Sequence, residues 1–120
     1  MATRVPVTTY GPNEQKNAVL VVWSGLLNGD DGTPFEHADF GDRSVQFQGT
    51  PGATPGIALE GSNDGTNWVV LTDPQGNAIT KTAAGTLETV EENTRFTRPR
   101  VTGGDGTTNW TVTLWGRRNR

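Results

Sequence analysis

Cysteine is absent from this 120-residue chain, and histidine, tyrosine and methionine each occur once. Without cysteine there is no disulfide and no thiolate metal site, so nothing cross-links the fold covalently. Apolar residues make up only 32% of the sequence, well below their usual share in globular proteins. We therefore expect a thin hydrophobic core, and the sequence leaves open whether a partner's surface completes it.

Long apolar runs are also missing. The longest, Ala18 to Trp23, has the length of a β-strand and is too short for a membrane span. The first residues, Met1 to Pro6, lack the apolar segment of a signal peptide. These absences predict a soluble protein that is made in a cytoplasm and has no membrane partner.

Glycine and proline are plentiful, at 16 and 7 residues, which is typical of strands joined by many turns. The length is that of one domain. The pattern predicts an all-β fold, an antiparallel sandwich or barrel with seven or eight short strands. The clearest strands are expected at Ala18–Trp23, Arg43–Gln48, Ile57–Glu60, Trp68–Leu71, Ala78–Thr80, Thr94–Val101 and Asn109–Gly116.

The most patterned stretch is the hairpin predicted between Gly56 and Thr72. Its two apolar runs flank a polar turn in which Gly65 can adopt a positive φ. A side-chain bond from Asp64 or Asn63 to the backbone would close that turn. Later in the chain, Pro99 has no amide to donate, so we expect an edge or a bulge there.

The four tryptophans stand out in a chain so poor in apolar residues. Two or three are expected in the core, Trp68 among them. In the last strand, Trp110 and Trp115 fall on opposite faces. Trp115 is then either exposed as an interface anchor or turned into the core by twist or a bulge.

The two ends of the chain are the expected contact regions. We expect residues 1–17 to form an extended arm, or a frayed terminus, attached to a single β-sandwich domain at 18–120. Val5, Val7 and Tyr10 would let the arm dock on a neighbour. At the other end, Arg117 and Arg118 follow Trp115 and suit a partner of mixed charge.

Residues for other functions are few. The net charge is -3 and the aromatics do not interleave with the arginines, so we expect no direct contact with nucleic acid. His37 is the lone histidine and no GxSxG motif accompanies it. The acidic loop at Asn28–Gly32 breaks the ligand spacing of an EF-hand. We therefore predict no enzymatic activity, no cofactor and no metal.

A resemblance appears in Leu59–Trp68, Leu71–Ala78, Arg98–Thr102 and Gly103–Thr108. These segments resemble small virion proteins of tailed bacteriophages, and most of all capsid decoration (cement) proteins. The resemblance implies a jelly-roll β-sandwich on the outer capsid surface of the virion. Its partners would be the major capsid protein and further copies of itself, and its function would be to stabilise capsomer junctions.

Two alternatives remain open. The hairpin motif also resembles discoidin-like and other carbohydrate-binding jelly rolls, in which case Trp68, with Asn67 and Asp64, would contact a glycan. A tail or neck component of the same virion would keep the structural class and change only the neighbour.

Overall fold

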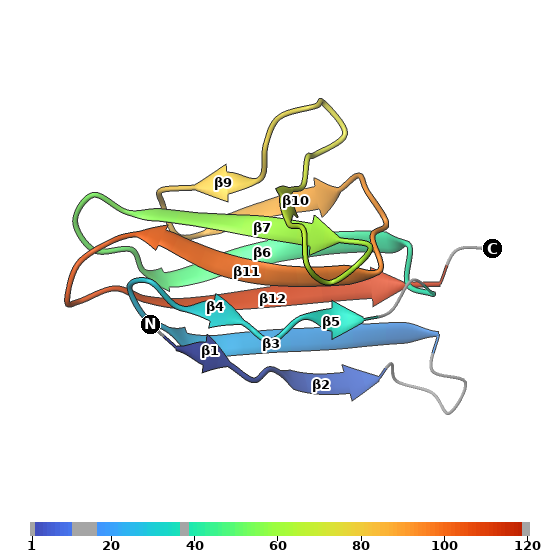
Figure 1. Ribbon diagram of the computed structural model, residues 1–120, viewed down its shortest axis with the longest axis horizontal. Coiled ribbons are helices and arrows are strands. Elements are labelled where there is room, and N and C mark those ends of the chain that lie inside the picture. The colour runs from blue at the N-terminus through green and yellow to red at the C-terminus, as the bar shows by residue number, and fades with distance from the viewer. Residues whose placement is uncertain (1, 11–16, 37–38, 119–120) are drawn as a thin grey trace.

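The computed structural model describes residues 2–10, 17–36 and 39–118, which form two β-sheets packed face to face (Figure 1). Within these ranges there are twelve strands and no helix, which confirms the all-β prediction. The strands are β1 (Thr3–Arg4), β2 (Val7–Tyr10), β3 (Ala18–Leu26), β4 (Asp31–Gly32), β5 (Phe35–Glu36), β6 (Asp42–Thr50), β7 (Gly56–Ser62), β8 (Val69–Val70), β9 (Thr80–Lys81), β10 (Thr86–Val90), β11 (Phe96–Gly103) and β12 (Asn109–Arg117).

The strand order is that of a jelly roll. One sheet has five strands in the order β10-β6-β12-β3-β2, and the other has seven, with β4 and β5 on one side of β11 and β8 and β9 beside β7. If β4 with β5 and β8 with β9 are each taken as one interrupted strand, the chain from β3 onward fills eight positions. The antiparallel jelly-roll prediction is therefore confirmed, although β3, β6 and β12 reach nine residues and are not short.

The core lies between the sheets, and strands such as β6 and β12 contribute alternate residues to it. In β12, for example, Trp110, Val112 and Leu114 are fully buried. The ring of Trp110 meets that of Phe47 from β6 edge to face, with centroids 6.4 Å apart. The inward residues form one continuous cluster, so the small apolar content suffices for a single core.

Trp23 closes the core beneath β4. Its indole Nε1 donates to the carbonyl of Thr33 at 3.0 Å. Gly32 lies directly against the ring, and a Cβ at this position would stand 2.6 Å from Trp23 and 2.7 Å from Pro99. This close approach explains why glycine occupies β4.

The N-terminal strands belong to the sandwich (Figure 1). β1 pairs in parallel with β4, and β2 pairs in antiparallel fashion with β3. The expected arm at 1–17 is thus extended, but its described part, residues 2–10, lies on the edges of both sheets. The boundary that we expected between an arm and a domain at 18–120 does not separate these strands from the sandwich.

The prediction of an edge or a bulge at Pro99 is wrong. β11 lies inside its sheet, between β7 and the interrupted strand β4 and β5. Pro99 is aligned with Leu59 in the antiparallel pair. The amide of Leu59 donates to Ile79 and its carbonyl accepts from Leu71, both on the side away from β11. The nitrogen of Pro99 therefore also points away from β7. On that side β4 ends at Gly32 and β5 begins at Phe35. The missing amide therefore faces an interruption in the neighbouring strand.

The predicted hairpin is present between β7 and β8, with Glu60 aligned with Val70. Gly65 has a φ of 77°, as the turn requires. The returning strand is shorter than expected, because only Val69 and Val70 form it. Trp68 precedes it and lies outside the ladder.

Candidate functional site

The outer face of the five-stranded sheet carries two rows of side chains that cross all five strands. The register aligns outward-pointing residues of neighbouring strands, so each row has one residue from every strand. We call these ten residues the uncharged face, because each has an apolar or a neutral polar side chain. The first row is Val7, Val22, Thr113, Gln46 and Leu87, and the second is Thr9, Leu20, Trp115, Ser44 and Thr89.

Large apolar groups on this face are open to solvent. Val7 is 67% exposed, Leu87 64% and Trp115 37%, while Leu20 and Val22 are half-buried between them. At one end of the face, Asp42 and Arg117 neutralise each other at 2.5 Å. Exposed apolar side chains gathered on one sheet face among neutral polar ones favour an interaction site.

The structure brings together two of the predicted contact residues from opposite ends of the chain. Val7 in β2 and Trp115 in β12 lie in adjacent rows of the uncharged face. The exposure of Trp115 resolves the two interpretations left open by the sequence, because Trp110 on the opposite face takes the place in the core. Val5 lies between β1 and β2 and is 79% exposed, outside the two rows. Tyr10 ends β2, and its side chain lies outside the described part of the chain.

The two terminal arginines, Arg117 and Arg118, form ion pairs with acidic residues of the same chain. Arg117 pairs with Asp42, and Arg118 lies 3.9 Å from Asp39, with its guanidinium 5.4 Å from the ring centroid of Phe40. Both arginines are exposed, but each has an acidic neighbour from the first half of the chain. The positive charge that follows Trp115 is therefore largely compensated by these two acids.

Asp30 ties the N-terminal strand β1 to the sandwich. Its carboxylate accepts hydrogen bonds from the amide of Ala2 at 2.8 Å, the Nε of Arg4 at 2.8 Å and the amide of Leu27 at 2.9 Å. The side chain is only 4% exposed. Burial alone would raise the pKa of Asp30, but the bonds from Leu27, Arg4 and Ala2 outweigh it and lower the pKa. Through Asp30, the acidic loop at Asn28–Gly32 thus acts as a structural clamp on β1.

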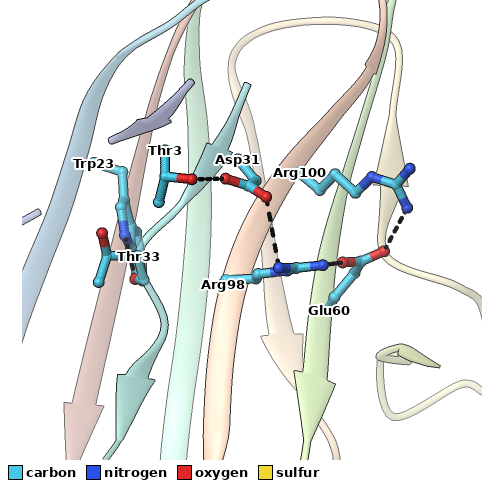
Figure 2. Close-up of polar contacts among 7 residues, drawn as sticks. All are labelled: Thr3, Trp23, Asp31, Thr33, Glu60, Arg98 and Arg100. Carbon is cyan, nitrogen blue, oxygen red and sulfur yellow. Dashed lines mark hydrogen bonds and ion pairs between the residues drawn. The ribbon is translucent and has the colours of Figure 1, made fainter. Parts of the chain in front are cut away.

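The outer face of the seven-stranded sheet has a different character (Figure 2). A chain of polar contacts runs across β1, β4, β11 and β7. Thr3 donates to Asp31, the guanidinium of Arg98 lies between Asp31 at 3.5 Å and Glu60 at 3.1 Å, and Arg100 approaches Glu60 at 3.5 Å. Arg98 and Glu60 are largely buried and therefore lose hydration. Each charge has a direct partner that compensates this loss.

Trp68 is not in the core, and that prediction is wrong. It is half-buried, and the guanidinium of Arg98 lies 4.0 Å from its ring centroid. The ring of Phe96 packs beside it at 6.5 Å. Trp68 precedes β8, and its side chain lies over the outside of the sheet against Arg98. The ring thus shields the buried ion pair from water.

The hairpin tip is internally bonded. The carboxylate of Asp64 accepts bonds from the amides of Asn67 and Thr66, from the side-chain amide of Asn67 and from Ser62, and these lower its pKa. A hollow of about 190 Å³ lies beside it. Neither Asp64 nor Trp68 lines this hollow. At the hairpin tip, the Asp64 carboxylate is already saturated and Trp68 is stacked on Arg98, so this geometry does not favour the glycan-binding alternative. The hollow is lined by Gly61, Ser62, Asn63, Asn67, Val69, Val70, Leu71, Glu92 and Thr94.

Two further kinds of site are absent from the described ranges. There, no group of three or more acidic, histidine or cysteine side chains is placed to hold a metal ion. The same ranges contain no helix with the length and apolarity that a bilayer span requires. His37 lies outside them.

Sequence reasoning missed most of the uncharged face. Alternation indicated the outward residues of β6 and β12, but it did not reveal that β2 and β10 extend the same surface on either side. Leu87 was missed because its segment had no clear pattern. The central ion pair of Arg98 and Glu60 was missed as well, because the two residues are far apart in sequence and only the β7–β11 register aligns them.

Comparison with known proteins shows the fold. Neither a protein-family model nor a curated protein matches this sequence. Among solved structures, the SPBc2 prophage-derived protein YomS is similar with a TM-score of 0.62 and 11% identity. The likeness covers 82% of this chain and 93% of that chain. The sandwich fold is therefore shared with a prophage-derived protein, over nearly the whole length of that protein.

Two enzymes are similar more loosely. KdgF from Halomonas sp. has a TM-score of 0.46 and 16% identity, over 95% of this chain and 76% of that chain. The Fe(II) form of HppE has a TM-score of 0.45 and 12% identity, over 92% of this chain and 49% of that chain. Likeness at this level carries no argument about activity.

Proposed function

We propose that this protein is a non-enzymatic structural protein of a tailed-phage virion, a head decoration protein that binds the outer capsid surface and stabilises capsomer junctions. The observation that carries the proposal is the uncharged face, a broad outer sheet surface with exposed Val7, Leu87 and Trp115. Such a surface serves contact with another protein. The fold shared with a prophage-derived protein supports a phage origin.

The sandwich suits a cementing function for mechanical reasons. Both sheets are tied together by one core, Asp30 fixes β1, and β2 is held by its pairing with β3. A rigid body that contacts two neighbours resists their separation. Repeated over a shell, modest contacts of this kind add up through avidity. The major capsid protein is the partner that this function requires, and the virion surface is the expected location.

The test is to compare phage particles with and without this protein by cryo-electron microscopy. Density at regular positions over the head that disappears in the deletion particle is the expected result. Adding the purified protein back to deletion particles should restore that density and raise the temperature at which DNA is released. Density confined to one vertex would overturn the proposal in favour of a neck or tail component. Particles that show no difference would overturn the virion assignment itself.

A further inference from the structure

We propose that Asn28 is a site of spontaneous deamidation, and that its conversion to isoaspartate releases β1 from the clamp at Asp30. The reaction needs only water and groups of the chain itself, so it stands apart from the proposed virion function. Three features support this modification site: the turn that holds Asn28, the freedom of the two reacting groups, and their nearness to Asp30.

Asn28 and Gly29 form the tip of the turn that joins β3 to β4. The amide of Asp30 closes this turn by donating to the carbonyl of Leu27 at 3.0 Å. Gly29 has a φ of 84°, whereas Asn28 does not have a positive φ, which is the pattern of a type II turn. The side chain of Asn28 is exposed, so water reaches it directly.

The two groups that react are both free. Within the described part of the chain, neither the side chain of Asn28 nor the amide of Gly29 has a hydrogen-bond partner. Because Gly29 has no Cβ, its nitrogen can approach the Cγ of Asn28 without a side chain in the way. Exposed loop tips also open locally at little cost in free energy. The turn therefore allows the nitrogen to reach the carbon that it attacks.

Three aspartates of the chain also precede a glycine, but their side chains are held. Each carboxylate accepts at least one hydrogen bond, and at the hairpin tip the amide of Gly65 is bonded as well, to Ser62 at 2.9 Å. A carboxylate is also attacked less readily than an amide, because its negative charge repels the nucleophile. Asn28 thus differs in both charge and freedom from these three residues, which are Asp31, Asp64 and Asp105.

The reaction passes through a cyclic imide. The nitrogen of Gly29 loses its proton to hydroxide and attacks the Cγ of Asn28, the bond from Cγ to Nδ2 breaks, and ammonia leaves after taking up a proton. Water then adds to one of the two ring carbonyls, and the bond from that carbon to the ring nitrogen breaks. Opening at Cγ gives aspartate. Opening at the main-chain carbon gives isoaspartate, in which the backbone runs through the side-chain methylene.

Isoaspartate at this position disturbs the clamp. Leu27 and Asp30 are joined by two bonds across the turn, from the amide of Asp30 to the carbonyl of Leu27 at 3.0 Å and from the amide of Leu27 to the carboxylate of Asp30 at 2.9 Å. An extra methylene in the backbone between them breaks this geometry, so the carboxylate shifts away from Ala2 and Arg4, which both donate to it. The new negative charge also repels that of Asp30.

The conversion makes the hold on β1 depend on the age of the molecule. It is a one-way change of covalent structure, so the fraction of released β1 increases with time. Release of β1 leaves the edge of β4 unpaired. An unpaired edge offers free backbone groups to another strand.

The test ages the isolated full-length protein in mildly alkaline buffer. Mass spectrometry of the tryptic fragment that spans residues 17–43 follows the loss of the Asn28 amide, and an isoaspartate methyltransferase labels the product. The rate should lie within about 10-fold of that in a free peptide of residues 25–33, because the loop tip opens easily. It should also rise in proportion to the hydroxide concentration.

Trypsin added to the native protein measures the release of β1. The aged protein should be cut after Arg4 at least about 10-fold faster than fresh protein, because the clamp no longer holds this residue. The matched control is Asn28→Gln, whose longer side chain would have to close a larger and less favourable ring. Over the same time it should stay intact and keep Arg4 protected.

Each result decides the matter. If Asn28 stays intact while the free peptide converts, the assignment of the site is wrong. Conversion without faster cleavage after Arg4 would overturn the release of β1. Equal gains in cleavage for the aged wild type and aged Asn28→Gln would place the cause elsewhere in the chain and also overturn it. If Asn28→Gln does not fold, judged by far-ultraviolet circular dichroism, Asn28→Ser replaces it, since serine has no amide to lose.

Discussion

Replacing Asp30 with alanine tests whether the N-terminal strands are an integral part of the fold. The substitution removes the acceptor of three hydrogen bonds, two from backbone amides and one from Arg4. It leaves the β1–β4 and β2–β3 pairings themselves unchanged. The expected consequence is a destabilised protein whose residues 2–10 detach before the rest of the sandwich unfolds.

The magnitude follows from these three bonds. A hydrogen bond to a charged group contributes about 1.5–3 kcal/mol. Arg4 is 38% exposed, so its ion pair with Asp30 counts at the low end, and both Arg4 and Ala2 can recover bonds to water once the carboxylate is gone. Leu27 is left with an unpaired amide near the core. We expect Asp30→Ala to lower the free energy of unfolding by about 3 kcal/mol, a large part of the roughly 5–15 kcal/mol typical of a domain.

Two measurements check this expectation. Guanidinium denaturation gives the change in free energy, and hydrogen exchange followed by mass spectrometry gives the protection of the peptide that spans residues 2–10. Asp39→Ala is the matched control, because Asp39 is 65% exposed and its ion pair with Arg118 is long, at 3.9 Å. Its free energy of unfolding should change by less than about 0.5 kcal/mol.

The reasoning about the clamp fails on either of two results. One is an Asp30→Ala protein that unfolds at the wild-type denaturant midpoint. The other is a destabilised protein in which residues 2–10 exchange no faster than in the wild type, because the loss would then come from elsewhere in the sandwich.

Three further expectations follow from the same contacts. Because the folded pKa of Asp30 lies below its unfolded value of about 3.9, its contribution is complete above that value and is lost as pH falls through the folded pKa. Acid titration should therefore destabilise the wild type more than Asp30→Ala, and equal slopes would contradict this. Arg98→Ala leaves the buried Glu60 without its closest partner and should cost about 3 kcal/mol in thermal denaturation. Gly32→Ala should cost about 1–3 kcal/mol by overpacking. Gly106→Ala, which has open space around it, should change little, and equal losses in both glycine variants would argue against steric crowding at Gly32.

Part of the fold could be predicted because it is encoded locally. Alternation over Asn109–Gly116 placed Trp110 and Trp115 on opposite faces, and the β12 burial pattern agrees. The turn before Trp68 was found from Gly65 and Asp64, since a positive φ and a side-chain bond to the backbone depend only on neighbouring residues. Local signals of this kind do not depend on which strands later become neighbours.

Other features could not be predicted, since they depend on pairings between distant segments. Pro99 was expected at an edge, but the interruption between β4 and β5 makes an interior position possible. Trp68 was expected in the core, but Arg98, brought alongside by the sheet, holds it outside. In the same way, Val7 and Trp115 were each predicted as contact residues for separate reasons, with no sign that they share a surface.

The sequence by itself determined the class of fold, the main hairpin, the alternation in strands such as β6 and β12 and the lack of a covalent cross-link. These follow from side-chain period, turn chemistry and composition, which act over a few residues. Only the tertiary structure decided that Asp30 holds the N-terminal strands, that Arg98 and Glu60 neutralise each other, and that five strands present one uncharged face. The reason is register, since strands far apart in sequence must align before their side chains form a common surface.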